Sequence, residues 1–445
     1  MSLCHLEKAF IMNEMKKIII SLILSILLMG CSTPTIERNE NEHVLFVITD
    51  PHYLDPSLSG GPLFDEMLTN FADGRLTQYC DELLDAFIDT CLKEKPDVVL
   101  VTGDITFNGE YYSHVTFAEK LAKLKKAGIQ PLVIPGNHDI ENPRAYNYSE
   151  EQLTYSRTIK PEEFREIYQD CGYNQAYLED ENSLSYVYAL NDHCWLLMLD
   201  SNKYEENTSF AASVGGRIRP AQLEWIEEVL KEASSKNIEV ICSTHHTLAQ
   251  MVEGENYQID NARSLADLLT KYNVKVNLCG HTHVQYYKEV ERENGIITDI
   301  MTSSYLINPH QYGKIEWIEE DHIQYDTFPV DVESWAKKNR IKDPFFTNFK
   351  DNAREFFKTN SVSRLGGYVE YDFLDEETKK ALLDLKGEGN VYAFSGRMPE
   401  FQDYYDQSGL DEVIDTLPEL SANFLRSNMT RFKYDGNHVY IDLKK

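Results

Sequence analysis

The sequence predicts an α/β fold for residues 43–330 and a smaller, mainly helical domain for residues 331–445. Three observations lead to this prediction. Short, continuous apolar runs alternate with longer segments whose apolar residues recur every three or four positions. Polar residues follow several of the short runs directly, as they do at ligand-binding edges of α/β sheets. After residue 330, clustered aromatic residues and helical spacing replace the alternation.

The strands and helices of the α/β part are predicted in order from residue 44. A continuous apolar run is expected for a strand that is buried on both faces, and such strands pair mostly in parallel. The predicted strands lie at residues 44–49, 98–101, 132–134, 195–199, 240–242 and 274–278. Helical spacing predicts helices at residues 83–92, 115–124, 220–230 and 262–269. Alternating residues around 315–317 and 323–325 predict a hairpin that closes this domain near residue 330.

The C-terminal segment is predicted to be a separate helical domain. Aromatic residues cluster between 335 and 357, and helical stripes follow near residues 381–385 and 413–425. No run of metal-ligand residues occurs in this segment. Three roles fit it equally: a cap over an active site, a dimerisation surface, or a stabilising domain.

The first 42 residues are predicted to be a targeting segment. Lys16 and Lys17 precede an apolar run that is too short to span a bilayer but has the length of a signal-peptide core. The run ends in a Leu-Met-Gly-Cys sequence that resembles a bacterial lipobox, in which Cys31 is lipidated. We predict an upstream extension over 1–14, a lipoprotein signal peptide over 15–30 and a tether over 31–42. The expected location is the outer face of a bacterial membrane; an uncleaved anchor is the alternative, and it too places the body outside the cytoplasm.

Charge and cysteine content exclude two classes of function. The formal net charge is −30, and such a surface repels nucleic-acid polymers. An enzyme for small anionic substrates would need a local source of positive charge, such as bound metal. The eight cysteines contain no CxxC pair, so a thiolate zinc site is not expected. Cys194, Cys242 and Cys279 lie in or beside apolar runs and are predicted to be buried small side chains.

Five short segments at predicted strand ends carry the chemistry. Each alone is a weak signal, because a lone histidine is more often a satisfied surface or core residue. Together they bring carboxylate, carboxamide and imidazole groups to one sheet edge, which suits Mn, Fe or Zn rather than Ca. The segments are Asp50-Pro51-His52, Gly103-Asp104, Gly136-Asn137-His138-Asp139, His245-His246 and Gly280-His281-Thr282-His283.

This set of motifs resembles that of the calcineurin-like metallophosphoesterases over about residues 43–330. The resemblance implies a four-layer α/β/β/α sandwich of two mixed sheets and two transition-metal ions, divalent or trivalent. It implies that one ion is held by Asp50, His52, Asp104 and His283. It implies that the other is held by Asp104, Asn137, His245 and His281, with Asp104 as the bridge. His245 is preferred over His246 because the family's ligand is the first residue of its His-containing segment, although Thr247 replaces the family's proline.

The resemblance also implies a reaction. Two ions clamp a phosphate ester, and a metal-bridging hydroxide attacks the phosphorus. His138 would face the phosphate and protonate the leaving oxygen or stabilise its charge. Asp139 either pairs with His138 and fixes its tautomer, or is a carboxylate that serves the loop or caps a helix. Asn137, His138 and His246 are the expected substrate contacts.

A finer resemblance is to bacterial class III cyclic-nucleotide phosphodiesterases, some of which are exported and carry a helical C-terminal domain. It rests on Asn108-Gly109-Glu110, Ser113-His114 and residues 303–313. It implies hydrolysis of phosphodiesters, in particular 3',5'-cyclic nucleotides. Two alternatives use the same residues: a phosphomonoesterase such as a nucleotidase, and a lipoprotein that binds a ligand without turnover. Asn261 is either a substrate contact or the N-cap of the helix after it.

Overall fold

The computed structural model describes residues 43–70, 73–251, 257–318, 322–366, 374–416, 422 and 434–444. The predicted extension over 1–14, the signal peptide over 15–30, the lipid site Cys31 and the tether over 31–42 lie outside the described residues. Within the described ranges, no helix is both long and apolar enough to cross a bilayer. Residues His43–Lys445 form a single unit, and the boundary proposed at residue 330 stays a prediction.

The first sheet has the strand order β15-β14-β13-β1-β2-β3. Its N-terminal strands are the first three apolar runs of the sequence, and every residue of β1 is buried. The strands are β1 (Val44–Ile48), β2 (Val98–Thr102), β3 (Gln130–Ile134), β13 (Gln311–Trp317), β14 (His322–Pro329) and β15 (His438–Asp442).

The second sheet has the order β11-β12-β10-β9-β8-β7-β6. Its strands are β6 (Leu178–Glu179), β7 (Tyr186–Ala189), β8 (Cys194–Met198), β9 (Glu239–Ser243), β10 (Val276–Cys279), β11 (Tyr286–Arg292) and β12 (Gly295–Met301). A separate two-stranded hairpin joins β4 (Tyr146–Asn147) to β5 (Thr154–Tyr155).

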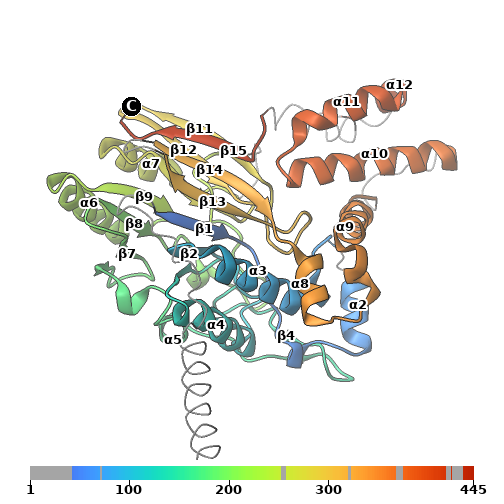
Figure 1. Ribbon diagram of the computed structural model, residues 1–445, viewed down its shortest axis with the longest axis horizontal. Coiled ribbons are helices and arrows are strands. Elements are labelled where there is room, and N and C mark those ends of the chain that lie inside the picture. The colour runs from blue at the N-terminus through green and yellow to red at the C-terminus, as the bar shows by residue number, and fades with distance from the viewer. Residues whose placement is uncertain are drawn as a thin grey trace, which may run out of the picture. The chain divides into compact units, whose positions relative to one another are not determined.

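The helices of the α/β part cover the outer faces of the two sheets (Figure 1). The helices are α2 (Pro62–Asn70), α3 (Cys80–Glu94), α4 (Tyr111–Lys126), α5 (Pro161–Ile167), α6 (Pro220–Ser235) and α7 (Ala262–Lys271). Short 3-10 helices are η1 (Pro56–Leu58), η2 (Thr77–Tyr79), η3 (Tyr173–Gln175), η4 (Tyr204–Glu206) and η5 (Pro344–Asn348).

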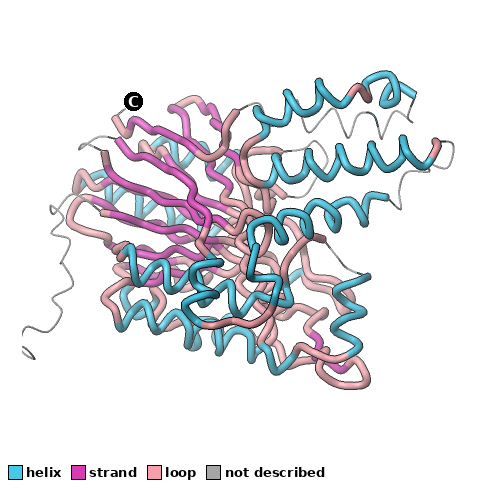
Figure 2. Tube along the Cα trace, turned by 45° about the vertical axis from the view of Figure 1, so that its right-hand side comes forward, coloured by secondary structure: helices cyan, strands magenta, loops and turns pink. Residues whose placement is uncertain are grey.

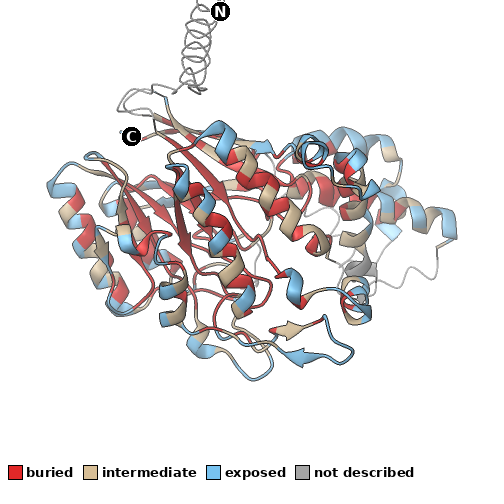
Figure 3. Cartoon of the chain, turned by 60° about the horizontal axis from the view of Figure 1, so that its bottom comes forward, coloured by how far each residue is buried: buried red, intermediate tan, exposed pale blue. Residues whose placement is uncertain are grey.

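Side-chain alternation along β8 shows how the layers are built. Leu196 and Met198 belong to the core shared with the first sheet and with α3 and α4. Trp195 and Leu197 belong to a second core with α6 and α7. Successive side chains of a strand point to opposite faces, so one strand contributes to both cores. The four-layer α/β/β/α arrangement expected from the resemblance is confirmed, and Figure 3 shows the buried strands between helices with exposed outer faces.

The expectation of mostly parallel pairing is wrong for the outer strands. Pairing is parallel from β1 to β3 and along β8-β9-β10-β12. The other pairs are antiparallel. For the pair β11–β12 the physical reason is connection length, because the short turn that joins these strands permits only an antiparallel hairpin.

The C-terminal segment is mainly helical, as predicted, but it also contributes a strand. Its helices are α8 (Val332–Asn339), α9 (Phe349–Gly366), α10 (Glu376–Phe394), α11 (Met398–Ser408) and α12 (Asp411–Thr416). Figure 2 shows the long helices α9 and α10 next to each other, and α10 also contacts α11. The segment then returns as β15, which pairs antiparallel with β14 of the first sheet.

Six cysteines lie within the described residues, and all are buried and unpaired there. Cys194, Cys242 and Cys279 are on β8, β9 and β10, where they fill space as small apolar side chains. The predicted burial is confirmed.

Candidate metal centre

All five motifs meet at one end of the two sheets. They follow β1, β2, β3, β9 and β10, whose parallel neighbours present the same ends. Five of the predicted ligand residues have left-handed backbone conformations: Asp50, His52, Asp104, His281 and His283 have φ of 50°, 38°, 47°, 66° and 61°. Such conformations cost about 1–3 kcal/mol each for residues other than glycine and concentrate at functional sites.

The first ligand group is Asp50, His52, Asp104 and His283, whose ligand atoms all lie within 4.8 Å of one another. His283 Nε2 is 3.2 Å from Asp50 Oδ1 and 3.1 Å from His52 Nε2. His52 Nε2 is 3.8 Å from Asp104 Oδ2. Donor atoms bound at about 2.1 Å to one cation lie about 3–3.5 Å apart, so these separations fit a shared ion.

One ligand atom in each of the two ligand groups has no hydrogen-bond partner within the described residues. Asp50 Oδ1 and His281 Nε2 are buried and make no hydrogen bond with any described residue. An unsatisfied buried polar group costs about 1–3 kcal/mol. Burial also lowers the pKa of His52 well below its usual value, so its imidazole is neutral and can act as a ligand. Nε2 of His52 and Nε2 of His283 face each other at 3.1 Å, a separation that fits two ligands of one cation.

The second ligand group surrounds His245. Its Nε2 is 3.4 Å from Asp104 Oδ1 and 3.2 Å from Asn137 Oδ1. Its Nδ1–H donates to the Thr102 carbonyl at 2.9 Å, which leaves Nε2 for an ion. The ring of His281 lies 5.0 Å from that of His245, centroid to centroid.

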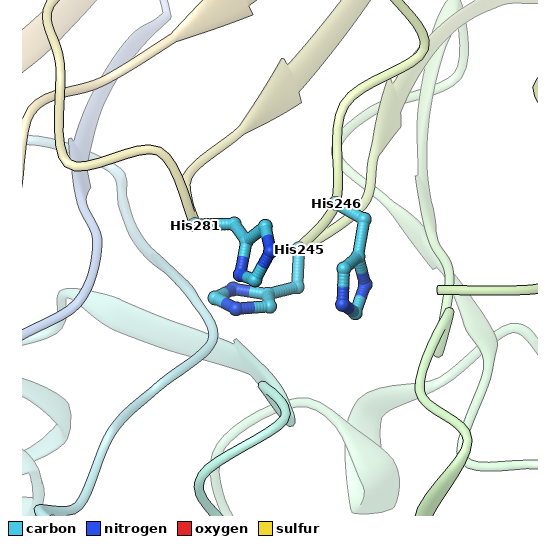
Figure 4. A group of neighbouring side chains, drawn as sticks. All are labelled: His245, His246 and His281. Atoms are coloured by element: carbon cyan, nitrogen blue, oxygen red, sulfur yellow. The ribbon is translucent and has the colours of Figure 1, made fainter. Parts of the chain in front are cut away.

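His246 lies in the same cluster but both of its ring nitrogens are occupied. Figure 4 shows His245, His246 and His281 gathered at one point, and their nitrogens lie within 4.8 Å of one another. His246 Nε2–H donates to the Val214 carbonyl at 3.0 Å, and Nδ1 bonds to Ser201 Oγ at 2.8 Å. The geometry therefore favours His245 over His246 as the ligand.

Asp104 stands between the two groups. Its Oδ1 faces His245 at 3.4 Å, and its Oδ2 faces His52 at 3.8 Å. Burial opposes its ionisation, yet the neighbouring charges of His245 and His138 hold its pKa well below the usual value. A methyl group on Gly136 would overlap the Asp104 backbone nitrogen and Oδ1, so only glycine fits there. The carboxylate is thus placed to serve both groups at once.

His138 is oriented by groups other than the one expected. Its Nδ1–H donates to the Phe107 carbonyl at 2.8 Å and lies 3.0 Å from Asn108 Oδ1. Its Nε2 lies 3.9 Å from Asp104 Oδ2, and the side chain is 30% exposed. The imidazole therefore presents Nε2 toward the centre and remains open to a ligand.

Of the two alternatives for Asp139, the structure shows no pairing with His138. The Asp139 carboxylate accepts from the backbone amides of Gly136 at 2.7 Å, Ile105 at 3.1 Å and Thr106 at 2.8 Å. Ile105 and Thr106 lie in the loop after β2, and Gly136 lies in the turn after β3. The Asp139 carboxylate therefore braces these two loops against each other. The alternative of a loop carboxylate fits this geometry, so the catalytic assignment of Asp139 is not supported.

The side chain of Asn261 does not cap α7, which was one of its two expected roles. It instead accepts from the Ile218 amide at 3.0 Å and donates to the Ile218 carbonyl at 2.8 Å.

Several supporting residues lie outside the five motifs. Asn142 and Arg75 carry no sequence signal, whereas Ser304 lies in the segment 303–313 on which the finer resemblance rests. Ser304 Oγ donates to the Asp50 carbonyl at 2.8 Å, and Asn142 Nδ2 donates to the His138 carbonyl at 3.2 Å. Arg75 belongs to none of the five motifs, yet its positive charge acts on His52 and His138. Asn108 lies in a segment that the sequence did single out, but its bond to His138 depends on loop conformation.

Comparisons with known proteins agree with this geometry. Residues 43–285 match the calcineurin-like phosphoesterase family, and residues 331–429 match the C-terminal domain of cyclic nucleotide phosphodiesterase. The probable glycerophosphodiester phosphodiesterase GpdQ of Arcobacter nitrofigilis is 31% identical over 43% of this chain and 58% of its own length. The 3',5'-cyclic adenosine monophosphate phosphodiesterase CpdA of Escherichia coli K12 is 24% identical over 42% of this chain and 54% of its own length.

The chain therefore spans about half the length of the curated relatives it matches. Among solved structures, a dimetal phosphatase from Danio rerio aligns with a TM-score of 0.46 and 14% identity, covering 64% of this chain and 95% of that chain.

Proposed function

Because the chain belongs to the calcineurin-like phosphoesterase family, we propose that it hydrolyses phosphodiesters, with 3',5'-cyclic nucleotides as the substrate class. One observation carries the proposal: each oxygen of Asp104 faces a different ligand group, with His138 beside them. A carboxylate shared by two cations in this way is the arrangement required for two-metal hydrolysis of a phosphate ester.

The residues present fit two transition-metal ions, which we propose to be Mn, Fe or Zn. Asp50, His52, Asp104 and His283 would hold one, and Asp104, Asn137, His245 and His281 the other. The ions supply charge neutralisation for the phosphoryl group and activation of a water molecule.

The protein's own side chains supply orientation and a proton. The Phe107 carbonyl fixes the proton of His138 on Nδ1, so Nε2 faces the centre. When protonated there, Nε2 donates to the leaving oxygen of the ester. Thr102 orients His245 in the same way, through its carbonyl.

Two considerations favour a diester over a monoester. At neutral pH a phosphodiester carries one negative charge and a monoester close to two, so a chain of net charge −30 repels the monoester more strongly. The match of residues 331–429 and the names of the two relatives, GpdQ and CpdA, support the same choice.

The test is a substrate panel on the full chain in detergent, reconstituted in turn with Mn, Fe and Zn. We expect higher kcat/KM for cyclic nucleotides and simple diesters than for matched monoesters. Equal or better monoester turnover would favour the phosphomonoesterase alternative. Metal uptake without hydrolysis above the metal-only control would favour a binding lipoprotein. Asp104→Ala should lose metal and activity, whereas Asp192→Ala, on the exposed surface, should keep both.

We also propose that the chain is exported and anchored through a lipid on Cys31. Labelling with a radioactive fatty acid should mark the wild-type protein and Cys4→Ser but not Cys31→Ser. Equal labelling of Cys31→Ser, or none of the wild type, would refute the anchor.

A further inference from the structure

An arginine outside the five motifs lies beside the proposed centre. Arg75 precedes η2, and its guanidinium carbon lies 5.4 Å from the centroid of the Phe107 ring. The carbonyl of Phe107 is the acceptor that orients His138, at 2.8 Å. The guanidinium therefore lies over the ring of Phe107, the residue whose carbonyl orients the proposed proton donor His138.

The Phe107 carbonyl links the Arg75 segment to the centre. His138, which this carbonyl orients, has its Nε2 3.9 Å from Asp104 Oδ2. His52 belongs to the first ligand group, and its ring lies 4.8 Å from that of His138, centroid to centroid. A substrate phosphate at these two residues would therefore lie within the field of the guanidinium.

An ion pair fixes the Arg75 side chain, and N–H groups of its guanidinium remain available to a ligand. Asp73 pairs with one terminal nitrogen at 2.6 Å, and Nε makes no hydrogen bond with any described residue. A guanidinium has five N–H donors in a rigid fork, so a single carboxylate leaves several for another oxyanion. The side chain is only 12% exposed, so little water competes for them.

The backbone around Arg75 is fixed from two directions. The Leu76 amide donates to the Leu306 carbonyl at 3.0 Å, which ties the segment to the loop after β12. Gly74 has φ of 86°, and a methyl group there would overlap the ring of Phe357 on α9. The catalytic loops and the C-terminal helices together set the position of the guanidinium.

We propose that Arg75 binds a non-bridging oxygen of the substrate phosphate and thereby gives this acidic chain its affinity for anionic esters. The proposal rests on the proposed function for the identity of the substrate. A planar, bidentate guanidinium suits a phosphate better than an ammonium does. Inorganic phosphate, which carries the same oxygens, is therefore the probe.

The experiment compares Arg75→Gln and Arg75→Lys with Arg292→Gln. Arg292 is the matched control, because it is 18% exposed and pairs with Asp267 at 2.6 Å as Arg75 pairs with Asp73. We expect Arg75→Gln to raise the Kd for inorganic phosphate, measured by calorimetry on metal-loaded protein, about tenfold or more. Arg75→Lys should recover part of that affinity. KM for esters should rise with kcat changed much less, while Tm and metal content stay at wild-type values.

The Asp73→Asn variant distinguishes phosphate binding by Arg75 from a purely structural role of Arg75 in its loop. If Arg75 binds phosphate, releasing it from Asp73 keeps or increases phosphate affinity. If Arg75 only braces its loop, the same change weakens both phosphate affinity and Tm. Unchanged phosphate affinity in Arg75→Gln, or an equal loss in Arg292→Gln, would overturn the proposal. Failure of the proposed function appears separately, as phosphate binding that depends on Arg75 in a protein that hydrolyses no ester.

Discussion

The proposed role of His138 at the metal centre depends on the groups that orient its ring. His138 can serve as a proton donor because the Phe107 carbonyl holds the proton on Nδ1. Asp139 supports it indirectly, since its carboxylate braces the two loops that carry the Phe107 carbonyl and His138. The orientation of one imidazole therefore depends on a network of backbone groups.

Replacing His138 should separate metal binding from turnover. We expect His138→Ala to keep its metal but to lose about 10²–10⁴ in kcat, with the larger loss for esters of poor leaving groups. Metal analysis and a leaving-group series measure the two effects. Asn108→Ala is the milder companion, since the Phe107 carbonyl remains as acceptor. Equal rates for good and poor leaving groups in His138→Ala would remove the assigned role.

Glu110 should make stability depend on pH. Burial raises its pKa from 4.5 to about 8, and only Oε2 has a hydrogen bond within the described residues, from the Asn108 amide at 3.0 Å. Between pH 4.5 and 8 the folded state binds a proton that the unfolded state does not. Its contribution is therefore complete below pH 4.5 and is lost as pH rises to about 8, by at most about 1.4 kcal/mol per pH unit. Denaturant midpoints should fall less over this range in Glu110→Gln than in wild type; equal slopes would contradict the burial effect.

The residue types of the centre were predictable because metal ligation restricts them. Motif order and strand ends placed Asp50, His52 and Asp104 at one sheet edge, and the family resemblance implied that they share an ion. It did not predict the bond between His138 and Asn108, or the proximity of Arg75. Those contacts depend on how loops without hydrophobic periodicity fold back, and no local pattern encodes that.

Strands and turns place the centre through close backbone approach. The loops after β2 and β3 meet where Gly136 touches Asp104, and there is no room for a side chain. The apolar runs predicted β1, β2, β3, β8, β9 and β10, since burial on both faces leaves continuous hydrophobic sequence, but the largely buried β12 was not predicted. The partly exposed β11 was missed because its sequence is mostly polar, although Asn294-Gly295 before β12 is a hairpin signal.

Filling the contact at Gly136 should disrupt the centre without unfolding the protein. In Gly136→Ala the added methyl displaces the Asp104 carboxylate, so we expect metal affinity and kcat to fall at least about tenfold. Gly389→Ala in α10 is the control, since its nearest new contact, with Phe401, is 3.2 Å and can adjust. Metal titration and activity measure both variants. Full activity in Gly136→Ala would mean that the loop has more room than the structure gives it.

At the scale of the whole molecule, the C-terminal helices are in contact with the catalytic part. Phe357 of α9 packs with Ile307 and Val391 and fills the space above Gly74. Among the three roles considered from sequence, this contact favours a stabilising domain. The sequence alone could not distinguish them, because the contact joins segments that are far apart along the chain.

Removing the Phe357 ring should affect binding through Arg75. We expect Phe357→Ala to lose about 3–5 kcal/mol of stability, as for other buried phenylalanines, and to raise KM for esters. In the Arg75→Gln background the same change should raise KM no further. A double-mutant cycle on KM and on denaturant midpoints checks this; additive effects on KM would show that the two residues act independently.

The return of β15 to the first sheet has a consequence for how the protein is made. The whole helical segment lies between β14 and β15, so during vectorial synthesis the β14 edge emerges long before its partner. An unpaired edge is a site for mispairing with other chains, and a distant strand closes slowly. A chaperone that binds unfolded chains would be most useful during this interval, because it would cover the unpaired β14 edge. Pulsed hydrogen exchange during refolding should find the β14 amides that face β15 protected later than those of β1. Simultaneous protection would mean that β15 pairs with β14 as early as the rest of the sheet forms.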